Sequence, residues 1–496
     1  MSALSHQQWQ KRADAIVPVT TAWIDGPVTS RSGRTRAAVN PATGAVLAEV
    51  TECDEHDVDL AVAAARRAFD RGHWSTASPR ERATVLHRVA RLIEDHVEEL
   101  ALLDTLDAGK RIVDTTAIDA PGTAAILRWY AESLDKVYGE VAPTGADDLA
   151  VVTREPLGVV AAIVPWNYPL ELAMWKIAPA LAAGNSVILK PAEDSPLSVL
   201  RLAELVAEAG MPEGVFSVVP GAGPVVGQAL GRHRGVDVVT FTGSTSTGQL
   251  FQQYAGQSNL KQVWLEAGGK SGVVVLDDVE DLDAVADGVA AGIFTNAGQV
   301  CSATSRLVVQ RGVADELVQR VVSRALAVRV GDPLDPATEM GPVVSERQAA
   351  RVLELMRTGA AEAGTVHGGG VVDGMPAGTF VRPQVLVGVD AAATIAQTEV
   401  FGPVLSVHVV DTVDEAVSVA NATPYALAAG LWTDGLRRAH GVARRLRAGT
   451  VSVNCVDALD VSTPFGGFGQ SGYGRDLSLH ALDKFTGLKT TWIRHG

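Results

Sequence analysis

Apolar residues recur three and four positions apart in the N-terminal part of the chain and form short continuous runs further on. Residues 57–70 and 79–107 follow the first pattern, with charges between the apolar positions, which predicts amphipathic helices. From Val159 onward, apolar runs alternate with helical stretches, as in VVAAIV, SVILK, SVLRLAELVAEAG, VFSVVP and VDVVTFTG. This alternation predicts an open parallel sheet with crossover helices, an architecture suited to binding nucleotides.

A second alternating series begins at SGVVVLDD, residues 271–278. It continues through LVVQ and a helix from Ala314 to apolar segments near positions 404 and 429. We therefore expect a second α/β domain. The tail contains LKTTWI, a β-branched and aromatic run suited to pairing with another chain or with a distant strand edge.

The length and the net charge of the chain limit the functions that it could have. With 496 residues, the chain is too long for one core and should form two or three structural units. The formal net charge of -15 argues against nucleic acid or an anionic membrane as a partner, because attraction to phosphate needs concentrated Lys and Arg. A small-molecule substrate fits this charge better.

The three cysteines, Cys53, Cys301 and Cys455, lie far apart, in neither a disulfide framework nor a zinc-binding spacing. The polar N-terminus lacks the apolar core of a secretory signal. The most apolar region, residues 159–189, is interrupted by charges such as Glu171, so it does not predict a membrane span. The sequence therefore predicts a cytoplasmic protein with reduced thiols and no bound metal.

Two residues suggest covalent chemistry. Cys301 follows a turn of small residues in NAGQVCSA, which leaves its sulfur accessible, although a lone cysteine is more often a small buried apolar residue. Glu266, in WLEAGGKSG, ends a predicted strand, and its plainest interpretation is a solvated turn carboxylate. A thioester formed on a cysteine must be hydrolysed, however, and a carboxylate can activate the water.

Asn167, in IVPWNYPL, follows an apolar strand and lies between Pro165 and Pro169, which restrict the turn. An asparagine in a turn usually serves only to stabilise the turn conformation. The functional alternative is a side-chain donor that stabilises an oxyanion together with the backbone N–H of Cys301. Losing such a donor typically costs roughly 3 to 4 kcal/mol.

The cofactor signal is FTGSTSTG, residues 241–248, where a glycine turn after a strand leads into a helix whose N–H groups can hold a pyrophosphate. Such turns also cap helices without any ligand. Lys190 and Glu193, in VILKPAEDSP, follow another strand at the sheet edge where ribose binds, although a charged loop is the simpler interpretation.

Taken together, these motifs resemble the aldehyde dehydrogenase superfamily over nearly the whole chain from about residue 20. The motifs occur in the family's order and at its spacing: PWN, KPAE, FTGSTSTG, EAGGK at 266–270, GQVC, EVFGPV at 399–404 and PFGGFGQSG at 464–472. The resemblance implies an α/β fold with a Rossmann-type NAD-binding domain, an α/β catalytic domain and a small β oligomerisation arm. It assigns residues 1–137 and 157–267 to the first, 268–470 to the second, and 138–156 and 471–496 to oligomerisation.

The same resemblance implies roles for individual residues. Cys301 would be the nucleophile, Glu266 the general base, Asn167 the oxyanion-hole residue and Lys176 a supporting residue. The residues implied at the cofactor are Ile163, Trp166, Lys190, Glu193, Gly223, Gly227, Phe241, Gly243, Ser244, Gly248, Gly268, Glu399 and Phe401. Those implied or suggested at the substrate are Tyr168, Trp175, Asp119, Val300, Ser302, Asp457, Leu459 and Asp460.

NAD is the cofactor implied, with NADP as an alternative, because the carboxylate of Glu193 would accept hydrogen bonds from ribose hydroxyls and repel a 2′-phosphate. Two positions depart from the family pattern. Ala267 stands where the family usually has Leu, and Asp476 where a longer Glu often supports the base. These differences put in doubt the packing near the nicotinamide and the efficiency of deacylation.

Three segments, at 119–125, 128–144 and 478–490, are similar to the bacterial branch that acts on γ-glutamyl-aminobutyraldehyde and other ω-aminoaldehydes. Asp119, Asp457 and Asp460 would line the entrance and attract an ammonium group, although surface solvation is the simpler role for each. The alternatives are a general aliphatic or aromatic aldehyde dehydrogenase, a CoA-acylating enzyme, against which Glu266 counts, and a non-catalytic binding protein. A homodimer or homotetramer is expected.

Overall fold

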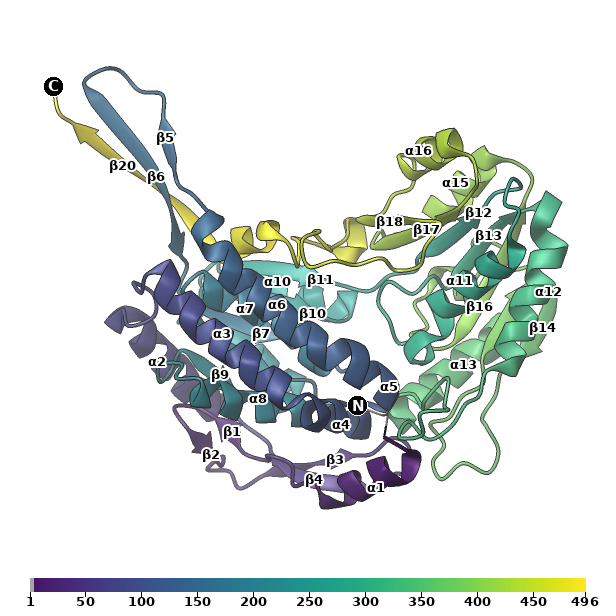
Figure 1. The fold of residues 1–496 in the computed structure, drawn as a ribbon, viewed down its shortest axis with the longest axis horizontal. Helices are drawn as coiled ribbons and strands as arrows, with labels where there is room; N and C mark the ends of the chain where they lie inside the picture. The colour runs from purple at the N-terminus through teal and green to yellow at the C-terminus, as the bar shows by residue number, and fades with distance from the viewer. Residues whose placement is uncertain (1–3) are drawn as a thin grey trace.

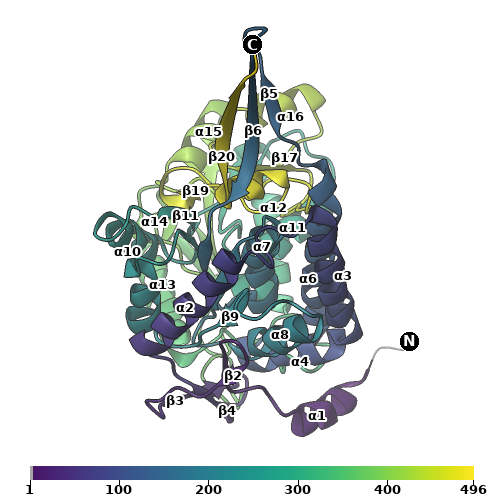
Figure 2. The same cartoon turned by 90° about the vertical axis from the view of Figure 1, so that its left-hand side faces the viewer.

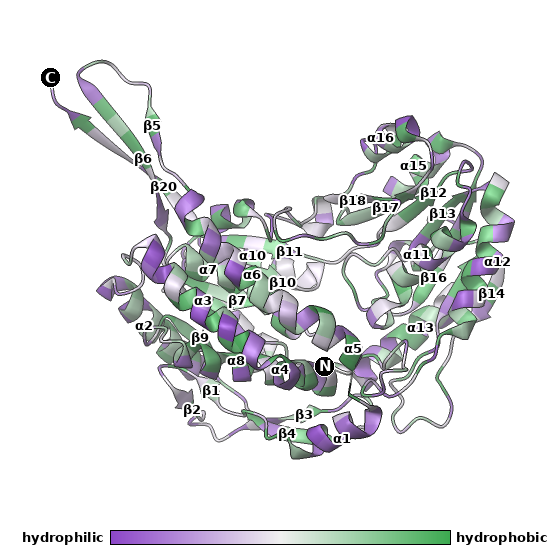
Figure 3. Cartoon of the chain, viewed as in Figure 1, coloured by the Kyte–Doolittle hydropathy of each residue, from purple (hydrophilic) through white to green (hydrophobic). Residues whose placement is uncertain are grey.

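Two open sheets flanked by helices form the body of the molecule, and a narrow three-stranded arm projects from it (Figures 1 and 2). The computed structural model describes residues 4–496. Figure 3 shows that the strands of both sheets are mostly hydrophobic, while the outer helices carry polar and apolar residues on different faces. This is the layered arrangement that the alternating sequence pattern predicts.

The strands of the first sheet are β1 (Ala22–Trp23), β2 (Pro27–Val28), β7 (Val159–Ile163), β8 (Ser186–Lys190), β9 (Phe216–Val218), β10 (Val238–Thr242), β11 (Gln262–Glu266) and β19 (Gly472–Tyr473). Their order is β19-β11-β10-β7-β8-β9-β1-β2, and the strands from β11 to β9 are parallel. The chain runs from β7 to β9 and returns on the other side of β7 as β10. The topological switch point, where such sheets bind ligands, therefore lies between β7 and β10.

Burial explains why apolar and polar residues do not alternate along these strands. Every residue of β7, β8 and β10 is buried, since helices cover both faces of the sheet. The helices of this half are α1 (His6–Ala15), α2 (Glu55–Arg71), α3 (Pro79–Asp95), α4 (Val97–Ala108), α5 (Ile112–Asp114), α6 (Ala120–Ser133), α7 (Pro169–Ala182), α8 (Leu197–Glu208), α9 (Gln228–Arg232) and α10 (Thr245–Gly256).

The helix expected over residues 57–70 is confirmed as α2, which Asp54 caps at its N-terminus and Gly72 ends in the left-handed conformation. The pattern over 79–107 instead forms two helices, α3 and α4. His96 separates them, because its backbone leaves the helical region and its ring hydrogen-bonds to the main-chain oxygen of Leu92. Helix α4 is buried throughout Leu100–Ala108, so an amphipathic helix is the wrong description for it.

The second sheet has the order β14-β15-β16-β13-β12-β17-β18 and is parallel except for β14. Its strands are β12 (Gly272–Val275), β13 (Arg306–Gln310), β14 (Thr365–Gly368), β15 (Gln384–Val387), β16 (Val404–Val410), β17 (Ala428–Trp432) and β18 (Thr450–Val453). Its helices are α11 (Leu282–Phe294), α12 (Arg311–Ala327), α13 (Glu346–Glu362), α14 (Thr394–Gln397), α15 (Val413–Asn421) and α16 (Leu436–Ala443). A second α/β unit is thus present where the sequence predicts one.

The arm consists of β5 (Glu140–Ala142), β6 (Asp148–Pro156) and β20 (Thr486–Arg494), with β6 in the middle. A separate hairpin is formed by β3 (Thr35–Val39) and β4 (Val46–Thr51). The C-terminal segment expected to belong wholly to the arm is divided instead. Strand β19 extends the first sheet and Phe485 lies in the core, because residues before β20 are apolar enough to pack on the body.

Within residues 4–496, no helix combines the length and the apolar character needed to cross a membrane. That part of the chain also brings no group of three His, Cys, Asp or Glu side chains into a metal-binding arrangement.

Candidate functional site

A crevice of about 840 Å³ opens at the carboxyl ends of β7 and β10 and is lined by residues of both halves of the body. It lies at the topological switch point of the first sheet, the usual ligand site of such folds. The predicted site residues that line it are Ile163, Trp166, Asn167, Trp175, Lys190, Glu193, Gly223, Gly227, Phe241, Gly243, Ser244, Glu266, Gly268, Cys301, Glu399 and Phe401.

Cys301 reaches the crevice from a strained turn. Asn296 and Ala297 have positive φ angles of 50° and 53°, and Gly298 follows with 73°. At Gly298 a side chain is excluded, because an added Cβ would lie 2.2 Å from the oxygen of Gly402. Consecutive left-handed residues are costly for any residue with a side chain, so surrounding contacts must hold this turn.

The thiol of Cys301 is half-buried, and its pKa is raised. Withdrawal from water is the largest cause, followed by the nearby carboxylates of Asp457, Glu399 and Glu266, while the backbone N–H of Ser302 acts in the opposite direction. The thiol therefore holds its proton in the free protein, and a thiolate would form only when a base or a bound ligand changes these surroundings.

Asn167 is tied to the same turn. Its side-chain Nδ2 donates a hydrogen bond of 2.9 Å to the main-chain oxygen of Gln299, two residues before Cys301. Its own main-chain oxygen accepts from Lys110 Nζ at 3.2 Å and from Asn296 Nδ2 at 3.1 Å. Because an amide nitrogen carries two hydrogens, one remains for a ligand beside the sulfur.

Glu266 ends β11, and its side chain is buried in the crevice wall. Neither carboxylate oxygen has a hydrogen-bond partner among residues 4–496. The pKa of Glu266 is raised well above its ordinary value, first by desolvation and then by Asp476, against the opposing effect of Lys176 and Lys484. Such a carboxyl takes up and releases a proton at a higher pH than an ordinary glutamate, as suits a general base.

Behind Glu266 lies a buried ionic group that the sequence suggested only in part. Asp476 accepts hydrogen bonds from both Lys176 and Lys484, and all three side chains are almost completely buried. Lys176 was expected to support the base, and it lies beside the crevice without lining it. Asp476, although shorter than the Glu common at this position, reaches both ammonium groups, so the ionic support is complete.

The cofactor residues form the other end of the crevice. Glu193 Oε1 accepts a hydrogen bond of 2.5 Å from the backbone N–H of Gly223, and its Oε2 lies 3.5 Å from Lys190 Nζ. Glu399 Oε1 accepts from the N–H of Gly269 at 3.0 Å. A Cβ added at Gly268 would lie 2.2 Å from Glu399 Oε2, so only glycine leaves room for this carboxylate.

Ser244 caps α10 at the turn where a pyrophosphate was expected. Its side chain accepts from the N–H of Thr247, while the turn itself faces the crevice through Gly243. Gly248 differs from expectation: it lies in the body of α10 and packs against Leu265, because a helical repeat from Ser244 turns this position toward the sheet.

Several residues expected at the substrate are not lining residues of the crevice. Asp119 is a correction, since it is 1% exposed and lies 3.0 Å from Lys110 Nζ, so it is no open carboxylate at an entrance. Asp460 is exposed but bonds to the backbone N–H of Ser462. Val300 and Ser302 flank Cys301 in sequence, and Asp457 is near enough to raise the pKa of its thiol. Tyr168 follows Asn167, and Leu459 is 42% exposed.

Two charged residues beside this site were not expected from the sequence. Lys110 is buried, and its Nζ lies 3.0 Å from the centre of the Tyr168 ring in addition to its contacts with Asp119 and Asn167. No motif pointed to it. Glu171 could have been found, because it lies on the same face of α7 as Trp175, four residues before it, and three residues after Tyr168, the N-cap of that helix.

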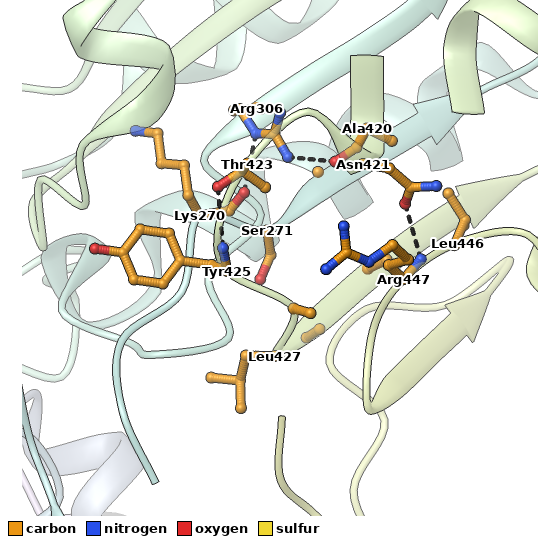
Figure 4. A pocket seen from close by; sticks show the side chains of 14 residues that line it. Lys270, Ser271, Arg306, Ala420, Asn421, Thr423, Tyr425, Leu427, Leu446 and Arg447 are labelled. Carbon is orange, nitrogen blue, oxygen red and sulfur yellow. Dashed lines mark hydrogen bonds between the residues drawn. The ribbon is translucent and has the colours of Figure 1, made fainter. Parts of the chain in front are cut away.

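A second hollow, of about 10 Å³, lies in the other half of the body (Figure 4). It has room for about one water molecule. Arg306 fills one side, and its guanidinium donates to the main-chain oxygens of Lys270 at 2.9 Å and Ala420 at 2.6 Å. This arrangement anchors the segment that follows Glu266, so we interpret the hollow as structural.

Comparison with known proteins agrees with this geometry. The profile described as "Aldehyde dehydrogenase family" matches residues 28–491. The NADP/NAD-dependent aldehyde dehydrogenase PuuC of Escherichia coli (strain K12) is 49% identical over 488 residues, which cover 98% of each chain.

Two solved structures match over the whole chain. The gamma-glutamyl-gamma-aminobutyraldehyde dehydrogenase of Burkholderia cenocepacia has a TM-score of 0.97 and 52% identity, covering 99% of this chain and 100% of that one. The indole-3-acetaldehyde dehydrogenase AldA of P. syringae, solved with NAD+ and IAA, has a TM-score of 0.97 and 49% identity over the same shares. Both the sequence and the fold show that this chain belongs to the aldehyde dehydrogenase family.

Proposed function

We propose that this chain oxidises an aldehyde to a carboxylic acid with NAD+ as electron acceptor, through a thioester on Cys301. The observation that carries the proposal is the convergence of Cys301, Glu266 and Asn167 on one crevice from distant parts of the sequence. A nucleophile, a base and an amide donor are the groups that such a reaction needs around one carbonyl.

The residues present fit a dinucleotide. Glu193 offers Oε2 toward the crevice while Gly223 holds its Oε1, and the turn at Gly243 leads into the N-terminus of α10, where a phosphate would meet backbone N–H groups. Glu399 and Phe401 would hold the nicotinamide end. When bound, the nicotinamide supplies the acceptor for the two electrons that leave the aldehyde.

The chain's own groups then account for acylation. Cys301, as thiolate, forms a bond to the carbonyl carbon, and the free hydrogen of Asn167 Nδ2 and the Cys301 N–H stabilise the oxyanion of the thiohemiacetal. Because the bond of Asn167 to Gln299 ties both residues to one turn, the donor and the sulfur keep a fixed separation. Oxidation converts the adduct to a thioester.

Glu266 would complete the reaction by deprotonating a water that attacks the thioester, which releases the acid and restores the thiol. Its buried, unpaired oxygens are free to accept that proton. A raised pKa suits the role, because a base must hold the proton briefly and then release it.

The substrate we favour is an ω-aminoaldehyde or γ-glutamyl-aminobutyraldehyde. Support comes from the relatives with such names and from Asp457, a carboxylate close enough to raise the pKa of Cys301. A general aliphatic or aromatic aldehyde dehydrogenase remains the second candidate, because the indole-3-acetaldehyde enzyme is 49% identical.

The test is NADH production with a panel of aminoaldehydes, aliphatic and aromatic aldehydes, with NAD+ or NADP+, in the presence and absence of CoA. We expect acid as the product, no dependence on CoA, and a preference for NAD+. Cys301→Ala should abolish turnover and still bind NAD+, whereas Cys455→Ala, at an exposed cysteine, should turn over at the wild-type rate. Turnover by Cys301→Ala would refute the mechanism.

We also propose that the arm joins copies of the chain into a homodimer or homotetramer. Its exposed apolar side chains support this, since Leu488 is 67% exposed and Trp492 is 63% exposed. The proposed cofactor-binding unit comprises residues 1–137 and 157–267, and the proposed catalytic unit comprises residues 268–470.

A further inference from the structure

Helix α7 carries, near its N-terminus, a carboxylate that forms no ion pair with residues 4–496. Glu171 lies one helical turn before Trp175 and three residues after Tyr168, which precedes the helix as its N-cap. Trp175 lines the crevice beside Cys301, and its ring packs against Phe465 with centroids 5.1 Å apart. Glu171 is only half-buried, so it can meet a ligand that follows this aromatic face.

The neighbouring helix leaves space beside the carboxylate. Gly122, in α6, faces Glu171, and a Cβ added there would lie 3.9 Å from Glu171 Oε1. A larger residue at this position would extend into the volume next to the carboxylate. Because glycine has no side chain, α6 does not cover Glu171 at this point.

Within residues 4–496, Glu171 makes no ion pair, in contrast to Asp119 nearby, which is paired with Lys110. A buried polar group lies beside it: the indole N–H of Trp175, a residue 5% exposed, is near enough to the Glu171 carboxylate to lower its pKa. A carboxylate without an ion pair in the described part of the chain, next to a buried N–H and aromatic rings, indicates a site built for a ligand rather than a solvated surface.

We propose that Glu171 recognises the cationic end of the substrate, with the ammonium group of an aminoaldehyde bound between its carboxylate and the rings of Tyr168 and Trp175. A carboxylate supplies the charge, and aromatic faces attract a cation where water is partly excluded. Lys110 cannot compete for Glu171, because Asp119 and the main-chain oxygen of Asn167 already hold it. This inference rests on the proposed aminoaldehyde substrate and names the residue that selects it.

The groups around Glu171 give the site a pH dependence. Desolvation, Asp119 and Asp104 raise the pKa of Glu171 to about 8, against the opposing effects of Lys110 and Trp175. Only the ionised carboxylate attracts an ammonium group. The KM for an aminoaldehyde should therefore fall as pH rises toward 8, and the KM for an uncharged aldehyde of the same length should not follow this curve.

The experiment compares 3-aminopropanal with butanal, its uncharged isostere, in wild type and Glu171→Gln. We expect the ratio of kcat/KM for 3-aminopropanal to that for butanal to fall at least about tenfold in the variant, since a charge-assisted hydrogen bond is lost. The fall should appear in KM, and the pH dependence of that KM should disappear. Glu132→Gln, at an exposed position of the facing helix, should keep the wild-type ratio.

The outcomes separate this inference from the proposed function. A wild-type enzyme that prefers 3-aminopropanal, with an unchanged ratio in Glu171→Gln, would overturn the assignment of Glu171 alone. A wild-type enzyme that oxidises butanal without any preference for 3-aminopropanal would refute the aminoaldehyde substrate itself. Equal losses on both aldehydes in Glu171→Gln would indicate a structural role and would also overturn the inference.

Discussion

Lys176 and Asp476 lie 300 positions apart in the sequence, and the ammonium group of the first donates a hydrogen bond to the carboxylate of the second in the interior of the protein. Lys484 donates to the other oxygen of Asp476. The group carries two positive charges and one negative charge, and Glu266 lies beside it. Burial of such a group is costly unless every member stays paired.

Asp476→Asn should therefore destabilise the protein strongly, by about 3 to 5 kcal/mol in the free energy of unfolding, because two buried ammonium groups lose their counterion. Denaturant titration measures this loss. Asp483→Asn removes a surface pair with Arg154 whose carboxylate side is 54% exposed, and should cost less than about 1 kcal/mol. Equal effects of the two substitutions would contradict the importance of the buried group.

The ion pairs of Asp476 with Lys176 and Lys484 also predict that the protein loses stability in acid. The two lysines lower the pKa of Asp476 below its ordinary value, despite desolvation, which is the largest single effect and acts to raise it. A depressed pKa stabilises the folded state above the unfolded-state pKa, and this contribution disappears as pH falls through the folded-state pKa. Wild type should lose stability in that acidic window more steeply than Asp476→Asn, which unfolding curves at several pH values would test.

Asn167→Ala should lower kcat by about 10² to 10³-fold, because the proposed oxyanion loses its side-chain donor. The substitution also removes the bond to the oxygen of Gln299, so the turn of Cys301 needs an independent check. Binding of NAD+, measured by fluorescence titration, should stay within a few-fold of wild type. A kcat near the wild-type value would exclude Asn167 from the oxyanion hole.

Much of the fold can be predicted from the sequence because its strands are buried on both faces. Continuous apolar runs such as Val159–Ile163 are typical of central parallel strands, and the alternation with helices predicts their order of appearance. The break at His96 was not predicted, because the apolar pattern runs through it without a proline or glycine. The packing of residues 472–485 on the body also required the tertiary structure, since short apolar segments do not reveal their partner.

The site was predictable to the extent that its residues follow strands. Glu266 ends β11, Gly243 follows β10 and Asn167 lies in the turn after β7, and parallel strands bring their carboxyl ends to one edge. Lys110 lies in the short loop between α4 and α5, and Glu171 lies in α7. At both positions a charged residue looks the same in sequence whether it faces solvent or a ligand. Burial separates these cases, and the burial of a single position is a tertiary property.

The proposed role of the arm predicts that Trp492→Asp weakens self-association. Trp492 lies on β20, which projects from the body with β6, and a carboxylate there would have to be desolvated in an interface between copies (Figure 2). Sedimentation should show a shift toward the mass of one chain, 51.8 kDa. Leu436→Asp, at a residue 75% exposed on α16, should leave the wild-type assembly unchanged. An unchanged assembly in Trp492→Asp would place the interface elsewhere.

The last prediction concerns Glu266 and separates the two halves of the proposed reaction. In Glu266→Gln, acylation should still produce about one NADH per active site, and the steady-state rate should then fall by about 10² to 10⁴-fold, because no base activates the hydrolytic water. Hydroxylamine, which attacks a thioester without a base, should restore turnover.

The pH dependence follows from the same carboxyl. Desolvation raises its pKa, so in wild type a falling pH protonates the base well above the usual range of a glutamate, and the deacylation rate should decline there. Rapid-mixing measurements of the burst and of the steady state across pH would resolve the two steps. If the burst itself disappears in Glu266→Gln while NAD+ still binds, the carboxylate acts before the thioester, as the base that deprotonates Cys301.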